Sequence, residues 1–310
     1  MDPGGWLTPF ITTDHSDPPM TALPETQKSQ KNTSRNDAAD HVVIIRPGKN
    51  FRLLNLKELW NYRELLWVLA MRDVKVRYKQ TVLGAAWAIL QPVLAMVIFT
   101  VFFGRLAKMP SEGYPYPLFV YTALLPWTFF ATAVANSGNS MIASANLVSK
   151  VYFPRLIIPL SAIGAGLMDF AIASTILLAM MIVYQVGWTL NLLLVPFLTV
   201  AVVFCALGVG ILLAALNVAY RDFRYVIPFL VQIWMFATPV VYPVSLVPES
   251  WRWMLFLNPM AGLIDGFRSA FLGKPFDASS LGISMGVALG IFLLGVAYFD
   301  HMERRFADII

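Results

Sequence analysis

The feature that most restricts the fold of this chain is the abrupt loss of charge after Lys79. Charged residues are frequent up to that position, and the next one along the chain is Arg105. A helix that crosses the hydrocarbon core of a bilayer needs about 20 predominantly apolar residues. The uncharged stretch is long enough, so we predict that the chain enters a membrane here, from a side rich in Lys and Arg.

The composition places the rest of the chain in the same class. Of its 310 residues, 58% are hydrophobic and 13% are charged, whereas soluble domains carry about 25% charged residues. The net charge of +5 comes from basic residues beside the predicted membrane entry points, which indicates contacts with membrane lipids and no nucleic-acid partner. The single cysteine, Cys205, excludes an internal disulfide and a cysteine metal cluster.

Six apolar runs predict an all-α polytopic membrane protein with six transmembrane helices. The runs cover about 84–103, 118–137, 156–184, 190–218, 226–243 and 281–299. If the N-terminus is inside, the internal segments from residue 44 onward carry 15 Lys and Arg residues and the external segments carry 5. Positive residues favour the cytoplasmic side, so both termini are predicted to be cytoplasmic.

The region before the first span divides into two parts. Residues 1–50 are rich in Pro, Asp, Ser, Thr and Asn and contain no signal-peptide pattern, which predicts a disordered cytoplasmic tail. Within 51–83, apolar residues recur at the spacing of one helix face: Leu56, Leu59, Trp60, Trp67, Ala70, Met71, Val74 and Tyr78. We predict an amphipathic helix in the membrane interface; the alternative is a helix packed on the underside of the protein. Residues 84–310 would form the transmembrane domain.

Two short apolar segments lie between the fifth and sixth spans. Trp251–Leu257 and Leu263–Leu272 are separated by Asn258-Pro259, and each is too short to cross a bilayer. Broken segments at membrane depth are tolerated where protein or a water-filled cavity surrounds them. We predict an outer re-entrant helix pair; the alternative is an ordinary external loop with two helices.

No pattern of catalytic residues is present. The sequence has no G-x-x-x-x-G-K-[ST], no H-E-x-x-H and no G-x-S-x-G, so we expect no catalytic, cofactor or metal site. Asp169 is the acidic residue deep within a predicted span, and it should face a partner or an aqueous path. A proton relay would normally need several such groups. Work done by this chain would therefore need energy from another chain.

Small and aromatic residues suggest where helices and ligands meet. Gly164 and Gly166 could admit a close helix neighbour, and Gly282, Gly286 and Gly290 form a stripe for packing within the chain or against another subunit. Aromatic side chains gather towards the predicted outer side, where they form an interfacial belt or stack on sugar rings. The candidates for a glycan path are Tyr114, Tyr116, Trp127, Phe130, Trp234, Tyr242, Trp251 and Trp253.

Several short motifs follow one another in a specific order. They are Arg77-Tyr78-Lys79 with Leu83-Gly84 and Trp87, then Lys150–Arg155, Asn217–Arg224, Thr238–Pro243 and Asn258-Pro259. In this order they resemble the permease subunits of bacterial ABC-2 exporters for O-antigen, capsular polysaccharide and teichoic acid. The resemblance covers residues 56–306 and excludes the tail.

The resemblance implies a homodimeric permease in the bacterial inner membrane, with two copies of a separate ATPase that binds ATP and Mg²⁺. The ATPase would dock on the loop between the second and third spans, at Asn139, Ser140, Asn146, Ser149 and Lys150. The N-terminal helix would act as a cytoplasmic gate. Its basic residues are candidates to receive the pyrophosphate of a lipid-linked glycan, although membrane topology also explains them: Arg72, Lys75, Arg77 and Lys79.

Two other functions remain open at this point. One is an ABC-2 permease for a small lipid, a drug or an ion, which would have the same fold and the same ATPase partner. The other is a membrane-embedded transferase that acts on lipid-linked sugars, which would need acidic or His residues gathered at one interface.

Overall fold

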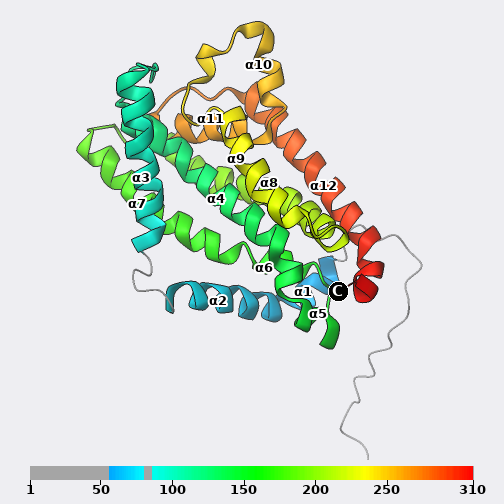
Figure 1. The fold of residues 1–310 in the computed structure, drawn as a ribbon. Coiled ribbons are helices and arrows are strands. Elements are labelled where there is room, and N and C mark those ends of the chain that lie inside the picture. Colours follow the sequence, from blue (N-terminus) through cyan, green and yellow to red (C-terminus); the bar gives the residue numbers. More distant parts are fainter. Residues whose placement is uncertain (1–55, 80–85, 310) are drawn as a thin grey trace, which may run out of the picture. The chain divides into compact units, whose positions relative to one another are not determined.

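The computed structural model describes residues 56–79 and 86–309, and every regular element in these ranges is a helix (Figure 1). The predicted tail, residues 1–50, lies outside the described residues. Helix is the expected solution for a chain in lipid, because a helix satisfies its backbone N–H and C=O groups within one segment.

Five helical segments are long and apolar enough to cross a membrane, which confirms five of the six predicted spans. Two of them are α4 (Tyr116–Ala143) and α12 (Ala278–Ile309). The other three are each built from two pieces, namely α3 (Ala86–Phe99) with η2 (Thr100–Leu106), α6 (Ile157–Ser161) with α7 (Gly164–Val183), and η3 (Leu190–Leu194) with α8 (Val195–Ala219).

The predicted fifth span is shorter than expected. Its helix, α9, covers Phe223–Ala237, which is 15 residues, and the chain continues to Pro243 without regular helix. A span of ordinary length needs about 20 residues. The count of six spans therefore stays a prediction.

The remaining helices lie at the two ends of the bundle (Figure 1). α1 (Leu56–Asn61), α2 (Arg63–Lys79) and α5 (Ala145–Lys150) lie at one end, where α2 runs across the ends of the longer helices. At the opposite end are η4 (Val244–Leu246), α10 (Glu249–Phe256) and α11 (Pro259–Leu272). This separation agrees with the predicted division between a gate helix and docking segment on one side and a broken helix pair on the other.

α4 is the central helix of the bundle. Within its apolar span, 78% of the residues are buried, compared with 6% for the span formed by α3 and η2. α4 contacts α3, α6, α7, α8, α9 and α11, and in Figure 1 it runs between α7 and α8. A displacement of α4 would therefore be felt by most of the bundle.

α8 and α12 approach closely because glycine removes the side chain at the contact. A Cβ added to Gly208 would lie 2.7 Å from the backbone of Phe292, and one added to Gly295 would lie 2.4 Å from the Gly208 carbonyl oxygen. In lipid, association depends on such close packing, because the lipid tails are as apolar as the side chains.

Among the residues that the structure describes, no other segment packs against the predicted glycine stripe of α12. A Cβ added to Gly282, Gly286 or Gly290 meets nothing within 4 Å in the described part of the chain. The expectation of intrachain packing is therefore wrong, because α8 meets α12 at Gly295 and Phe292 instead. The alternative, a contact with another subunit, stays a prediction.

The close contact predicts different effects for the same substitution at two glycines of the bundle. We expect Gly208→Ala to destabilise the protein by about 1–3 kcal/mol, because the added methyl group meets backbone atoms that cannot move aside easily. Gly286→Ala is the matched control and should leave stability unchanged. Thermal unfolding followed by size-exclusion chromatography in detergent measures both; equal melting temperatures for the two variants would contradict the contact.

Candidate functional site

The helix α2 is held against the third span at a glycine. α2 contacts both α6 and α7, and a Cβ added to Gly164 would lie 2.9 Å from the Ala70 side chain. Leu69 and Ala70 are the buried residues of α2. The predicted close neighbour of Gly164 is therefore confirmed, and it is the N-terminal helix. The second glycine, Gly166, faces the ring of Phe129 at 3.5 Å.

The apolar residues of α1 and α2 face in two directions. Leu69 and Ala70 pack beneath the spans, whereas Trp60 and Trp67 are exposed. The alternative of a helix that packs on the protein itself is thus confirmed for one face. The exposed tryptophans are typical of a helix that also contacts the membrane interface, and this second contact stays a prediction.

Asp169 has the partners that its position in an apolar helix requires. One carboxylate oxygen lies 2.8 Å from Nη1 of Arg77, and the other accepts a hydrogen bond of 2.5 Å from the Tyr78 hydroxyl. Burial, and then the bond to Asp169, raise the pKa of Tyr78 above its ordinary value, so its hydroxyl stays protonated and donates. Two consecutive residues of α2 therefore hold both oxygens of one carboxylate on α7.

The structure divides the four predicted basic residues of the gate. Arg77 faces Asp169 on α7, whereas Arg72 bonds its own neighbour Asp73 at 2.9 Å. Lys75 and Lys79 are exposed and lie four residues apart, on one side of the helix. Residues two apart in a helix do not share a side, so the four side chains do not form a single patch. Their role as a phosphate receiver stays a prediction.

The predicted docking segment is a short helix after a break. α4 ends at Ala143, and α5 follows directly after Ser144. Val148 is buried and anchors α5 to the bundle. The exposed side chains of α5 are those of Asn146, Ser149 and Lys150.

The other two predicted docking residues lie in the last turns of α4. Ser140 is buried and donates to the Ser137 carbonyl oxygen at 2.6 Å. The Asn139 side-chain oxygen accepts a bond of 3.1 Å from Asn217 on α8. Ser140 and Asn139 therefore bond within the bundle, and the exposed side chains of the predicted docking set are those on α5.

A cavity of about 410 Å³ lies beside α5, which the sequence analysis did not anticipate. It is formed between the end of α4 and the turn from α8 to α9, and its lining includes Ile142, Asn217, Arg221, Asp222, Arg224 and Tyr225. The charged run in Asn217–Arg224 was the available signal, but its closeness to α5 depends on the tertiary packing.

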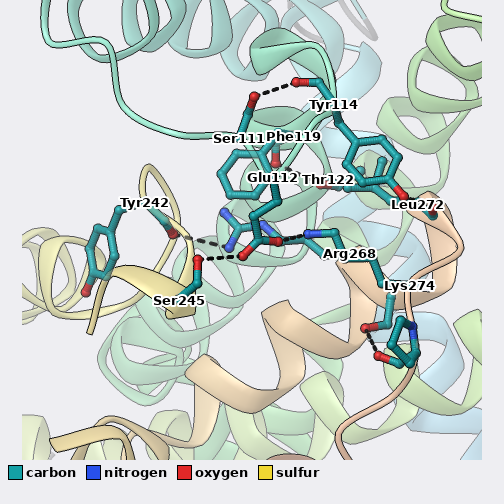
Figure 2. Close-up of polar contacts among 12 residues, drawn as sticks. Ser111, Glu112, Tyr114, Phe119, Thr122, Tyr242, Ser245, Arg268, Leu272 and Lys274 are labelled. Atoms are coloured by element: carbon teal, nitrogen blue, oxygen red, sulfur yellow. Dashed lines mark hydrogen bonds and ion pairs between the residues drawn. The ribbon is translucent and has the colours of Figure 1, made fainter. Parts of the chain in front are cut away.

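At the opposite end, a buried arginine joins α11 to α4 (Figure 2). Arg268 is 1% exposed and donates to the backbone oxygens of Val240 and Tyr242 at 2.7 and 3.3 Å. Its guanidinium also lies 3.8 Å from the ring centroid of Phe119 on α4. These contacts supply donors to a non-helical stretch whose carbonyl oxygens would otherwise lack partners.

A second set of polar contacts closes the same end (Figure 2). Glu112 accepts hydrogen bonds from Lys274, with which it also forms an ion pair, and from Ser245 at 2.8 Å. Burial opposes the ionisation of Glu112, but the bonds from Lys274 and Ser245 outweigh it, so its pKa lies below the ordinary value of 4.5. We call Glu112, Ser245, Arg268 and Lys274 the outer cluster.

Asn258 explains why the broken pair of helices is broken at this point. Its side-chain oxygen caps α11 by accepting from the Met260 backbone at 3.1 Å, and Pro259 occupies the first helical position. The same side chain accepts from the Trp234 indole at 2.9 Å and donates to the Thr238 hydroxyl at 2.8 Å. The predicted helix pair is present as α10 and α11; its depth in the membrane stays a prediction.

The eight predicted path aromatics occupy different environments. Trp127 and Phe130 are buried in α4, where Phe130 packs edge-on against Trp234 with a centroid distance of 5.2 Å. The hydroxyls of Tyr114 and Tyr116 each donate to a backbone oxygen at 2.7 Å, those of Leu272 and Val241. Tyr242 is partly buried, whereas Trp251 and Trp253 on α10 are exposed. Of the eight predicted aromatic residues, Trp251 and Trp253 are the most accessible to a ligand, because their side chains are exposed.

Comparison with known proteins decides the family. Residues 64–272, from the first turn of α2 to the end of α11, match the family model described as ABC-2 type transporter. The chain belongs to this family. Within the ABC-2 chain, the matched region contains both α2, with its contact to Asp169, and the complete α10–α11 pair.

Three relatives illustrate the kinds of protein to which the ABC-2 chain is similar. The O-antigen export system permease protein RfbA of Myxococcus xanthus is 31% identical over 258 residues, which are 82% of this chain and 98% of the relative. RfbA of Klebsiella pneumoniae is 30% identical over 248 residues, or 80% and 95%. The polysialic acid transport protein KpsM of Escherichia coli is 22% identical over 240 residues, or 76% and 92%.

The depressed pKa of Glu112 predicts an acid-sensitive outer cluster. A lowered carboxylate pKa stabilises the folded state above the ordinary value of 4.5, and this stabilisation is lost as the pH falls through the folded-state pKa. We expect Glu112→Gln to lower the free energy of unfolding by about 1 kcal/mol at pH 7. The stability of this variant should also fall less with decreasing pH than that of the parent protein. Thermal unfolding between pH 7 and pH 3 measures this.

The matched control is Glu249→Gln, because that carboxylate is exposed on α10 and 88% accessible. It should follow the parent protein at each pH. Parallel curves for the parent protein and the Glu112 variant would contradict the assignment.

Proposed function

We propose that the ABC-2 chain is the membrane subunit of an ATP-driven exporter that moves a lipid-linked polysaccharide across the bacterial inner membrane. The observation that carries this proposal is the match to two O-antigen export permeases over 95% and 98% of their own length. The relative named for polysialic acid transport adds a second glycan over 92% of its length.

A separate ATPase subunit would supply the energy. Permeases of the ABC-2 type work with such a partner, and this sequence contains no Walker motif of its own. We propose two copies of each subunit, with the permease as a two-fold homodimer, and with ATP and Mg²⁺ bound by the ATPase. The exposed side chains of α5 support a docking role for that helix.

The connection between α5 and α4 supports a way to transmit force. α5 follows α4 after a single residue, Ser144, and Val148 holds it to the bundle. α4 is buried along most of its length and contacts α5 as well as most of the other helices of the bundle. A push on α5 by closing ATPases would therefore move α4 and change its packing against α7 and α8, which would open a path between the two permease copies.

The two ends of the bundle would serve entry and exit. With both termini in the cytoplasm, α2 would lie at the cytoplasmic entrance, and its contacts with Asp169 would hold that side closed. The α10–α11 pair lies at the other end, where the exposed Trp251 and Trp253 offer flat apolar surfaces for a sugar ring.

The docking proposal predicts a selective loss of the ATPase. We expect the double substitution Asn146→Ala and Lys150→Ala to reduce the amount of ATPase that copurifies by about tenfold, equivalent to about 1.4 kcal/mol, because it removes two exposed contacts. The quantity of permease in the membrane should not change. Affinity purification from the native host with quantitative mass spectrometry measures both subunits.

Glu249→Gln, at the opposite end, is the control and should retain the ATPase. Deletion of the gene in the same host should leave a lipid-linked glycan on the cytoplasmic side of the membrane. If the deletion strain exports its glycan normally, although the parent strain contains the permease–ATPase complex, the glycan is rejected as the substrate. A small lipid, a drug or an ion is then favoured.

A further inference from the structure

The contact between Asp169 and α2 has two properties that a purely structural contact does not need. It is accessible, since the side chains of Arg77 and Asp169 are 41% and 24% exposed. It also joins one of the predicted phosphate-receiving residues to a carboxylate of the same chain. Arg77 is therefore already occupied by an anionic group when no ligand is bound.

We propose that Asp169 competes with a lipid phosphate for Arg77, and that a phosphate-bearing lipid releases the last turns of α2 from α7 by taking the guanidinium. Guanidinium groups bind carboxylates and phosphates through the same charge-assisted hydrogen bonds. A diphosphate carries more negative charge than a carboxylate, so it replaces Asp169 at Arg77 when it is present. Only the hydrogen bond from Tyr78 then remains on Asp169.

The position of α2 identifies the class of anion. The exposed Trp60 and Trp67 favour a position at the level of the lipid headgroups, where the abundant anions are phosphates. Lys75 and Lys79 are exposed on another side of the same turns of α2. Neither has an ion pair in the described part of the chain, and their positive charge attracts anions to this part of the helix.

The contact at Gly164 determines what moves. Ala70 packs against Gly164 two helical turns before Tyr78. Loss of the ion pair at Arg77 leaves this packing intact, so the helix pivots about Ala70 while its C-terminal turns swing away from α7. Binding of the lipid would thus open the contact between the C-terminal turns of α2 and α7.

The experiment measures the distance between α2 and α7 in the full-length chain. Cys205 is replaced by Ala, and spin labels are attached to cysteines at the exposed positions Val76 and Val183. The labelled protein is diluted with unlabelled copies and placed in phosphatidylcholine bilayers. Four bilayers are compared: phosphatidylcholine alone, and the same lipid with polyprenyl diphosphate, with polyprenol, or with phosphatidylglycerol.

We expect polyprenyl diphosphate to lengthen the distance by about 5 Å, one helical turn, whereas polyprenol, which lacks phosphate, should have no effect. Asp169→Asn should show the longer distance in phosphatidylcholine alone. Arg77→Gln should also show it and should not respond to any lipid. Asp73→Asn is the matched control, because its carboxylate binds Arg72 within α2; it should behave as the parent protein does.

The lipids also separate two sources of phosphate. A response to diphosphate alone assigns the site to the lipid carrier, and an equal response to phosphatidylglycerol assigns it to bulk anionic lipid. The competition is rejected if Asp169→Asn keeps the short distance, or if saturating diphosphate leaves the parent protein unchanged.

This inference rests on the proposed function only for the identity of the lipid. Neither ATPase nor glycan is present in the measurement, so a failure of the export proposal would leave the response to phosphate in place. A missing response in a chain that still exports glycan would reject the competition alone.

Discussion

The absence of water inside a bilayer is the constraint on which the rest of this structure depends. A polar group that is cut off from water, in lipid or inside the protein, must find its partner within the protein, and the chain provides such partners in three ways. Helices satisfy the backbone, Asp169 is held by Arg77 and Tyr78, and Arg268 serves carbonyl oxygens where the helix stops. Each such contact also fixes the relative position of segments that are distant in the sequence.

One such contact joins helices at each end of the bundle, and the two contacts differ in how deeply they are buried. Arg268 is buried, so solvent and ions from outside cannot reach the contact of α11 with α4. Asp169 and Arg77 remain partly accessible, so an ion from outside can reach them. The same physical requirement thus yields a buried contact at the α11 end and, at the α2 end, an accessible contact that we propose a ligand releases. α4 lies between them and contacts both α7 and α11.

Patterns that depend on neighbours along the chain were predicted well. The apolar runs identified five spans, and Asn258-Pro259 identified the break between α10 and α11, because capping is local chemistry. The prediction that Asp169 needs a partner was confirmed, but the sequence did not predict which residues provide it. The predicted packing of the α12 glycine stripe failed for the same reason. The spacing of the glycines shows that a close contact is possible, but it does not show which helix makes that contact.

By itself, the sequence determined the membrane class, the helical fold, most of the helix boundaries and the family motifs, since hydropathy, capping and charge act over a few residues. Only the tertiary structure decided that Arg77 and Tyr78 meet Asp169, that Trp127 and Phe130 are buried in the core, and that a cavity lies beside α5. These outcomes depend on how whole helices rotate and cross. Such geometry follows from the packing of many side chains at once, which no short stretch of sequence encodes.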